Sequence, residues 1–218
     1  MKDSSVILRI LAAIGAALAA MVVAFSPGQA RAQAPDARKD NAGSFGKPIM
    51  LVAKPSLAAA YRQTVLLVVP LGETEHVGFI INRPLEQTLG TIFPDHPPAQ
   101  KVVDPVRFGG PVMADTVFAM VRSPRGPGGA SQRLFGDLFI ASRANDIDRI
   151  IEQTPNDARY FIGFVGWRPG ELDAEIAKGF WFVLDPQAEL LFRKDTNEIW
   201  KELVHRLGVE PNPGQRAL

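Results

Sequence analysis

The chain has 218 residues, with 24 basic side chains, 23 acidic side chains and no cysteine. The lack of cysteine excludes disulfides, thiolate nucleophiles, zinc–cysteine sites and iron–sulfur clusters. A net charge near zero gives no overall attraction to nucleic acid, so we expect no nucleic-acid partner.

The N-terminal sequence predicts a removable export signal. Lys2 and Arg9 are positively charged, and residues 10–25 form an unbroken run of 16 apolar or small residues. Ala30 and Ala32 then place small side chains at the two positions that a signal peptidase reads, so we expect cleavage after Ala32. The alternative, an uncleaved anchor, would need about 20 apolar residues.

The predicted organisation is a signal peptide at 1–32, a disordered leader at 33–44, one domain at 45–210 and a tail at 211–218. Residues 1–32 hold three of the 24 basic and one of the 23 acidic side chains, so the mature part has a net charge of about −1. No other segment has the length and apolarity of a membrane span, and we expect none in the mature chain. The predicted location is periplasmic or secreted.

Apolar runs predict strands at 49–53, 65–69 and 77–81, the last two joined as a hairpin by residues 72–76. Pro84 is expected to open a helix that runs to Ile92. Further strands are expected at 102–108 and 116–121, followed by a flexible loop rich in proline and glycine at 122–132.

A strand around 138–140 precedes a helix for which Ser142 is the expected N-cap. Next come a strand at 160–165, a helix from Pro169 to Gly179, a strand at 180–184 and a candidate strand at 190–192. Asp195 and Glu198 resemble a capping box before the last helix, which ends at Gly208. Hairpins followed by alternating strands and helices indicate an α+β or mixed-sheet fold rather than a doubly wound one.

Three stretches are candidates for a site, and each has a structural alternative. Asn82 either bonds nearby backbone or, with Arg83, lines a cleft for a carboxylate or phosphate. Gly109 and Gly110 either permit a tight turn or form an amide nest for an anion.

The third stretch is 163–172. Trp167 either caps the core or forms an aromatic docking surface. Glu171 lies in the first turn of the helix predicted after Pro169, where the dipole favours a negative charge.

The three histidines lack metal-ligand spacing, and no nucleophile or nucleotide-loop motif is present. We therefore expect neither a metal nor another cofactor, and we assign no catalytic residue. A hydrolase-like enzyme that uses His76 and Glu171 as acid–base groups stays open as an alternative.

The motifs in this order resemble the AlgH/YqgE family. The stretches that carry the resemblance are 51–57, 78–84, 109–112, 163–172, Trp181 and 200–203. The resemblance implies a compact α+β fold with a barrel-like, bifurcated and mostly antiparallel sheet flanked by helices. It also implies a family without an established activity, some of whose members are described as transcriptional regulators.

The sequence departs from the family pattern in three respects. Residues 75–78 read Glu-His-Val-Gly in place of Gly-Ala-Met-Gly, and Glu171 replaces a glutamine. Most members also lack an export signal.

The expected function is that of an exported, non-enzymatic binding or regulatory module of the cell envelope, with a protein or small molecule as its partner. The expected surface combines Asn82, Arg83, Gly109, Gly110, Trp167 and Glu171. The alternatives are the hydrolase-like enzyme and, if the signal is not used, a cytoplasmic transcriptional regulator.

Overall fold

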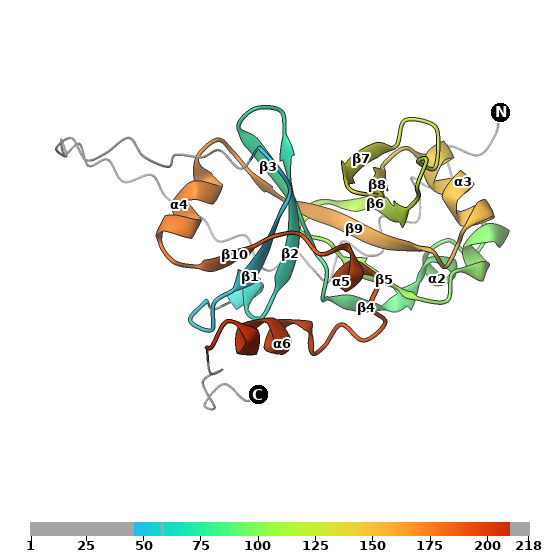
Figure 1. The fold of residues 1–218 in the computed structure, drawn as a ribbon. Helices are drawn as coiled ribbons and strands as arrows, with labels where there is room; N and C mark the ends of the chain where they lie inside the picture. Colours follow the sequence, from blue (N-terminus) through green and yellow to red (C-terminus); the bar gives the residue numbers. More distant parts are fainter. Residues whose placement is uncertain (1–45, 58, 210–218) are drawn as a thin grey trace. The chain divides into compact units, whose positions relative to one another are not determined.

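The computed structural model describes residues 46–57 and 59–209 (Figure 1). The strands are β1 (Ile49–Ala53), β2 (Val65–Leu71), β3 (Glu75–Ile80), β4 (Pro84–Thr88), β5 (Pro105–Phe108), β6 (Val112–Arg122), β7 (Gln132–Phe135), β8 (Leu138–Ala141), β9 (Ala158–Trp167) and β10 (Trp181–Leu184). The helices are η1 (Ala59–Tyr61), α2 (Leu89–Ile92), η2 (Pro97–Lys101), α3 (Ala144–Gln153), α4 (Glu171–Ala177), α5 (Ala188–Phe192) and α6 (Ile199–Arg206).

The predicted signal peptide, leader and tail lie outside the described residues. Within the described part of the chain, no helix has the length and apolarity needed to cross a membrane.

The strands form one sheet that divides along β9. The order is β10-β1-β2-β3-β9-β6-β8-β7, with β4 and β5 branching from β9. The second half of β9 pairs with β3, whereas its first half pairs with β6 and, in parallel, with β5. In Figure 1, β9 extends from the group of β1–β3 to the group of β6–β8. A mostly antiparallel, bifurcated sheet with flanking helices confirms the expected α+β fold.

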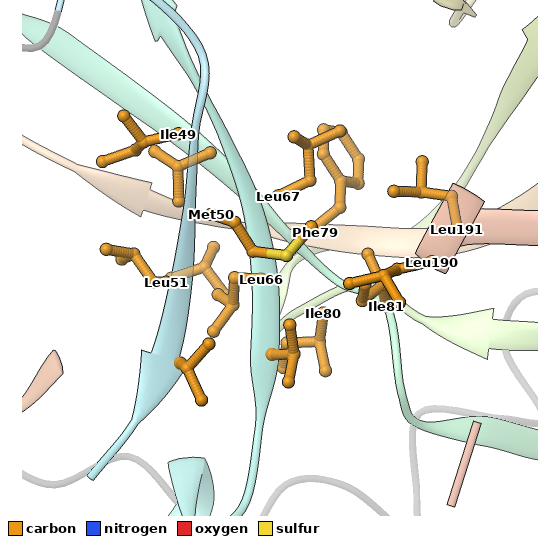
Figure 2. Close-up of a cluster of buried hydrophobic side chains, with 14 of the residues drawn as sticks. Ile49, Met50, Leu51, Leu66, Leu67, Phe79, Ile80, Ile81, Leu190 and Leu191 are labelled. Carbon is orange, nitrogen blue, oxygen red and sulfur yellow. The ribbon is translucent and has the colours of Figure 1, made fainter. Parts of the chain in front are cut away.

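The main core surrounds β1 and β2. Every residue of β1 is buried, as its uninterrupted apolar sequence predicts for a strand covered on both faces. Figure 2 shows Met50 next to Leu66 and Phe79, with Leu190 and Leu191 of α5 beside Ile81. The Trp200 indole of α6 donates a 2.7 Å hydrogen bond to the Ala53 carbonyl, which ties α6 to the end of β1.

A second core lies under α2, η2 and α3. Ile147, Ile150 and Ile151 of α3 are buried there against the β6 and β9 side of the sheet. Their i, i+3, i+4 spacing is the one that predicted the helix.

The helix predicted from Pro84 to Ile92 is wrong over its first half. Pro84–Thr88 is strand β4, which pairs irregularly with β5 through Pro84↔Arg107 and Thr88↔Pro105. Only Leu89–Ile92 is helical, and the Thr88 hydroxyl accepts a hydrogen bond from the Thr91 amide at the start of this helix. Tertiary pairing has overridden the local preference of proline for a helix start.

The strand predicted at 190–192 is instead the short helix α5. Two buried arginines bond the carbonyls at its C-terminal end. Arg107 donates to Leu191 at 2.6 Å and to Arg193 at 2.9 Å, and Arg159 donates to Phe192 at 2.9 Å. These bonds satisfy carbonyls that a helix end leaves unpaired.

The expected caps also differ from those observed. The N-cap of α3 is Arg143 rather than Ser142, and the N-cap of α6 is Glu198, in both cases without a side-chain capping bond. The Asp195 carboxylate accepts a bond from the Asn197 amide at 3.0 Å, so it stabilises a turn before α6 instead of a capping box.

Candidate binding site

Asn82 and Arg83 hold the turn that precedes β2. The Asn82 amide accepts a bond from the Val65 N–H and donates one to the Gln63 carbonyl, both at 2.8 Å. Gln63 has a φ of 58°, so these bonds fix a left-handed residue. Arg83 donates to the Arg62 carbonyl at 3.2 Å, and burial lowers its pKa, an effect that Tyr61 partly offsets.

Trp167 belongs to a cluster that the sequence did not reveal. The buried Trp167 indole donates to Glu175 Oε2 at 3.1 Å, and the Trp181 indole donates to the same oxygen at 2.8 Å. Tyr61 meets Trp181 edge-on, with 6.0 Å between ring centroids. Burial, and then the Glu175 charge, raise the pKa of Tyr61, with Arg83 acting in the opposite direction. We call Tyr61, Trp167, Glu175 and Trp181 the indole–carboxylate cluster.

Gly109 and Gly110 lie where the sheet divides. The Gly109 amide donates to the Ile162 carbonyl at 2.8 Å, and the Gly109 carbonyl accepts from Ile80 at 2.9 Å. A Cβ on Gly110 would lie 2.2 Å from the Phe164 carbonyl carbon, and one on Gly163 would lie 2.2 Å from the Gly110 oxygen. Side chains are therefore excluded where these backbones meet, and the Gly109 amide is already bonded within the sheet.

We call Gly109, Gly110 and Gly163 the glycine node, and the pairing of β6 with β9 is irregular directly after it. Val112 pairs with Phe164, but the next pair is Val117 with Ile162, so residues 113–116 stand opposite Gly163 alone. Val112 is 41% exposed and Met113 is 52% exposed. Met113 has a φ of 50°, a left-handed conformation that is unfavourable for a residue with a Cβ. The first four residues of β6, 112–115, are all exposed, and we call them the β6 bulge.

Glu171 and His76 lie on different elements, α4 and β3. The exposed Glu171 carboxylate accepts a bond from the Arg168 amide at 2.8 Å, where it caps the start of α4. His76 is buried on β3, opposite Trp167. The contact made by Glu171 gives it a structural role and does not favour its pairing with His76 in acid–base chemistry.

A hollow of about 560 Å³ lies elsewhere, between the proline- and glycine-rich loop and α3. Its lining consists of Gly129, Ala130, Arg143, Ala144, Asn145, Asp146 and Arg149. Asp146 bonds the Ala130 amide and Arg149, both at 3.0 Å, and so joins the loop to the helix. None of the residues singled out from the sequence lines this hollow. Over residues 46–57 and 59–209, no group of three or more histidines and carboxylates could hold a metal.

The stretches 78–84 and 163–172 meet where Gly78 faces Trp167, whereas Gly109 and Gly110 lie between β5 and β6, against Ile162 and Phe164 of β9. Gly78 lies against the Trp167 ring, and Tyr61 couples electrostatically to both Arg83 and Glu175. Phe164, which pairs with the β6 bulge, is three residues from Trp167, or about 10 Å along a strand. Glu175 could have been found in the sequence because it lies on the face of Leu172 and Ile176, where a carboxylate requires a partner.

The fold is that of solved AlgH-type α+β proteins. The solution structure of AlgH from Pseudomonas aeruginosa superimposes with a TM-score of 0.63 at 24% identity, covering 84% of this chain and 99% of that one. A crystal structure from Corynebacterium diphtheriae gives a TM-score of 0.61 at 23% identity, with coverages of 81% and 92%.

The model of the AlgH-like family, DUF179, matches residues 50–212, and the chain belongs to this family. A UPF0301 protein of Vibrio parahaemolyticus is 30% identical over 173 residues, which are 74% of this chain and 91% of the relative. A UPF0301 protein of Chlorobium limicola is 28% identical over 165 residues, with coverages of 74% and 86%. The resemblance inferred from the motifs is thus confirmed, and the biochemical function of the family is uncharacterised.

Proposed function

We propose that the protein is an exported, non-enzymatic binding module of the cell envelope and that it recognises a protein partner through the β6 bulge. Export is supported by the two positive charges, the 16-residue apolar run and the small residues before the expected cut after Ala32. Some members of the family are described as transcriptional regulators. A regulatory role that acts through envelope proteins is therefore the second role that we propose for this module.

The observation that carries the binding proposal is the strained and exposed conformation of Met113. A left-handed residue with a Cβ costs roughly 1–2 kcal/mol, and such strain concentrates at functional sites. The neighbouring glycine node excludes side chains, so the bulge is presented from closely packed backbone. A surface that is held in one conformation loses little entropy when a partner binds.

The exposed side chains indicate the chemistry of the partner. Val112 and Met113 offer apolar surface, and Asp115 adds a carboxylate at the end of the bulge. Methionine adapts its shape to irregular apolar surfaces and is frequent at binding sites. The partner surface therefore combines an apolar hollow with a polar or basic rim.

The test is capture of envelope proteins by the purified chain and by Met113→Gly. Glycine removes the side chain and adopts a positive φ without strain, so this variant should be at least as stable as the original protein. Val103→Ala is the matched control, because Val103 is 69% exposed and is bonded to Asn156, close to the opposite end of β9.

We expect recovery of the partner to fall at least about tenfold with Met113→Gly, equivalent to about 1.4 kcal/mol of binding free energy. Recovery with Val103→Ala should match that of the original protein. Equal recovery of the same partner by all three proteins would exclude the β6 bulge as the recognition surface.

A further inference from the structure

We propose that Met113 is an oxidation-sensitive site, at which a peroxide forms methionine sulfoxide and makes the β6 bulge polar. The proposal deepens the proposed function, because it supplies a chemical means of changing the same surface. Its chemical part needs no partner and can be tested separately.

The sulfur atoms of the chain are few and unequally exposed. The sequence has no cysteine and five methionines, of which Met1 and Met21 fall in the predicted signal peptide. Met50 and Met120 are 0% exposed in the core, whereas Met113 is 52% exposed. Among the described residues, Met113 is therefore the one exposed methionine, and we expect its sulfur to be the one that a dissolved oxidant reaches while the protein is folded.

The reaction is a two-electron oxygen transfer from hydrogen peroxide. A lone pair of the thioether sulfur attacks one peroxide oxygen, the S–O bond forms and the O–O bond breaks. The departing hydroxide takes up the proton of the transferred OH group, so the products are a sulfoxide and one water. Sulfur is oxidised by two electrons and peroxide is reduced by two.

The product changes the surface and leaves the core in place. A sulfoxide is polar and accepts hydrogen bonds, whereas the thioether is apolar. Since about half of the Met113 residue already faces solvent, the added oxygen has room and the glycine node is untouched. An apolar partner would then have to desolvate a polar group, which weakens binding.

The first test is the rate of sulfoxide formation at each methionine. The folded protein is treated with dilute hydrogen peroxide, and peptides containing Met50, Met113 and Met120 are quantified over time by mass spectrometry. We expect Met113 to react at least about tenfold faster than the two buried methionines, and the three rates to converge in urea. Similar rates for all three in the folded protein would overturn the proposal.

The second test measures the polarity of the surface on a hydrophobic-interaction column. Met113→Leu is the matched variant, because leucine has a similar size, keeps the apolar surface and cannot form a sulfoxide. After peroxide treatment the original protein should elute earlier, and Met113→Leu should elute as before. An unchanged elution of protein that carries the Met113 sulfoxide would refute the change in polarity, whatever the capture experiment shows.

Discussion

The ring of Trp167 packs against the backbone of Gly78, and a Cβ built on Gly78 would lie 2.6 Å from Trp167 Cζ3. The two residues lie on the neighbouring strands β3 and β9, where Gly78 pairs with Val165. The glycine thus leaves the space in which the indole reaches Glu175.

Replacing Gly78 with alanine should destabilise the protein by about 1–3 kcal/mol, the usual cost of overfilling a packed core. The ring has to move, and its bond to Glu175 is strained as a result. Urea unfolding followed by tryptophan fluorescence measures the change. Gly166→Ala is the control, because a Cβ there meets only Phe164, at an ordinary 3.6 Å. Equal effects of the two substitutions would contradict this account of Gly78.

Glu175→Ala, which removes the carboxylate, should lower the free energy of unfolding more than Glu175→Gln, which only removes its charge. Glu175→Ala leaves two indole N–H groups without their acceptor, and each unsatisfied buried donor costs about 1–3 kcal/mol. We expect a loss of about 2–4 kcal/mol for Glu175→Ala and about 1 kcal/mol for Glu175→Gln, whose amide oxygen still accepts a bond. An alanine variant as stable as the glutamine variant would show that the two bonds contribute little.

The glycine node should tolerate no side chain. Gly163→Ala combines a φ of 67° with a Cβ 2.2 Å from the Gly110 oxygen, so we expect a loss of more than about 3 kcal/mol or a failure to fold. Gly136→Ala isolates the backbone effect, because Gly136 has a φ of 51° and open space around its Cβ position. Gly136→Ala should lower the free energy of unfolding by about 1–2 kcal/mol. Comparable unfolding midpoints for the two variants would argue against close backbone contact at the branch.

Both tyrosines of the chain should ionise at unusually high pH. Burial is the main cause that raises the pKa of Tyr61 and of Tyr160; Glu175 adds to the effect at Tyr61, and Arg159 opposes it at Tyr160. A pKa that is higher in the folded state means that the protonated phenols stabilise the fold. This stabilisation is complete below pH about 10 and is lost as the pH rises through the folded-state values.

An ultraviolet titration of phenolate absorbance measures this effect. The chain has two tyrosines, so Tyr61 and Tyr160 supply the whole phenolate signal. At pH about 10 the folded protein should show much less phenolate than the same protein in urea. Glu175→Gln should lower the pKa of Tyr61 by removing the nearby negative charge. Superimposable titration curves for the folded and unfolded protein would contradict the burial of both phenols.

Helices and strands were predictable from the sequence where the residues of the segment itself determine its structure. β1 and the hairpin of β2 and β3 consist of apolar runs with a turn between them, and they appear where the pattern places them. The helix α5 was missed because its end is held by Arg107, which is 84 residues away from Leu191 in the sequence. β4 was missed because pairing with β5, rather than its own composition, makes Pro84–Thr88 extended.

The candidate site shows the same division. Asn82 was expected to bond backbone close to it in the sequence, whereas its two backbone partners, Val65 and Gln63, lie 17 and 19 residues away. The indole–carboxylate cluster joins Tyr61, Trp167, Glu175 and Trp181 from η1, β9, α4 and β10, so no local motif contains it. The β6 bulge depends on a register shift between two strands, which a single sequence does not encode in a readable pattern.

Cell fractionation with N-terminal sequencing tests the central claim, that this domain functions outside the cytoplasm, most directly. The account predicts that the protein is recovered from the envelope or periplasmic fraction with Gln33 as its first residue. Recovery of the intact chain from the cytoplasm, beginning at Met1, would contradict export and would favour the alternative of a cytoplasmic regulator.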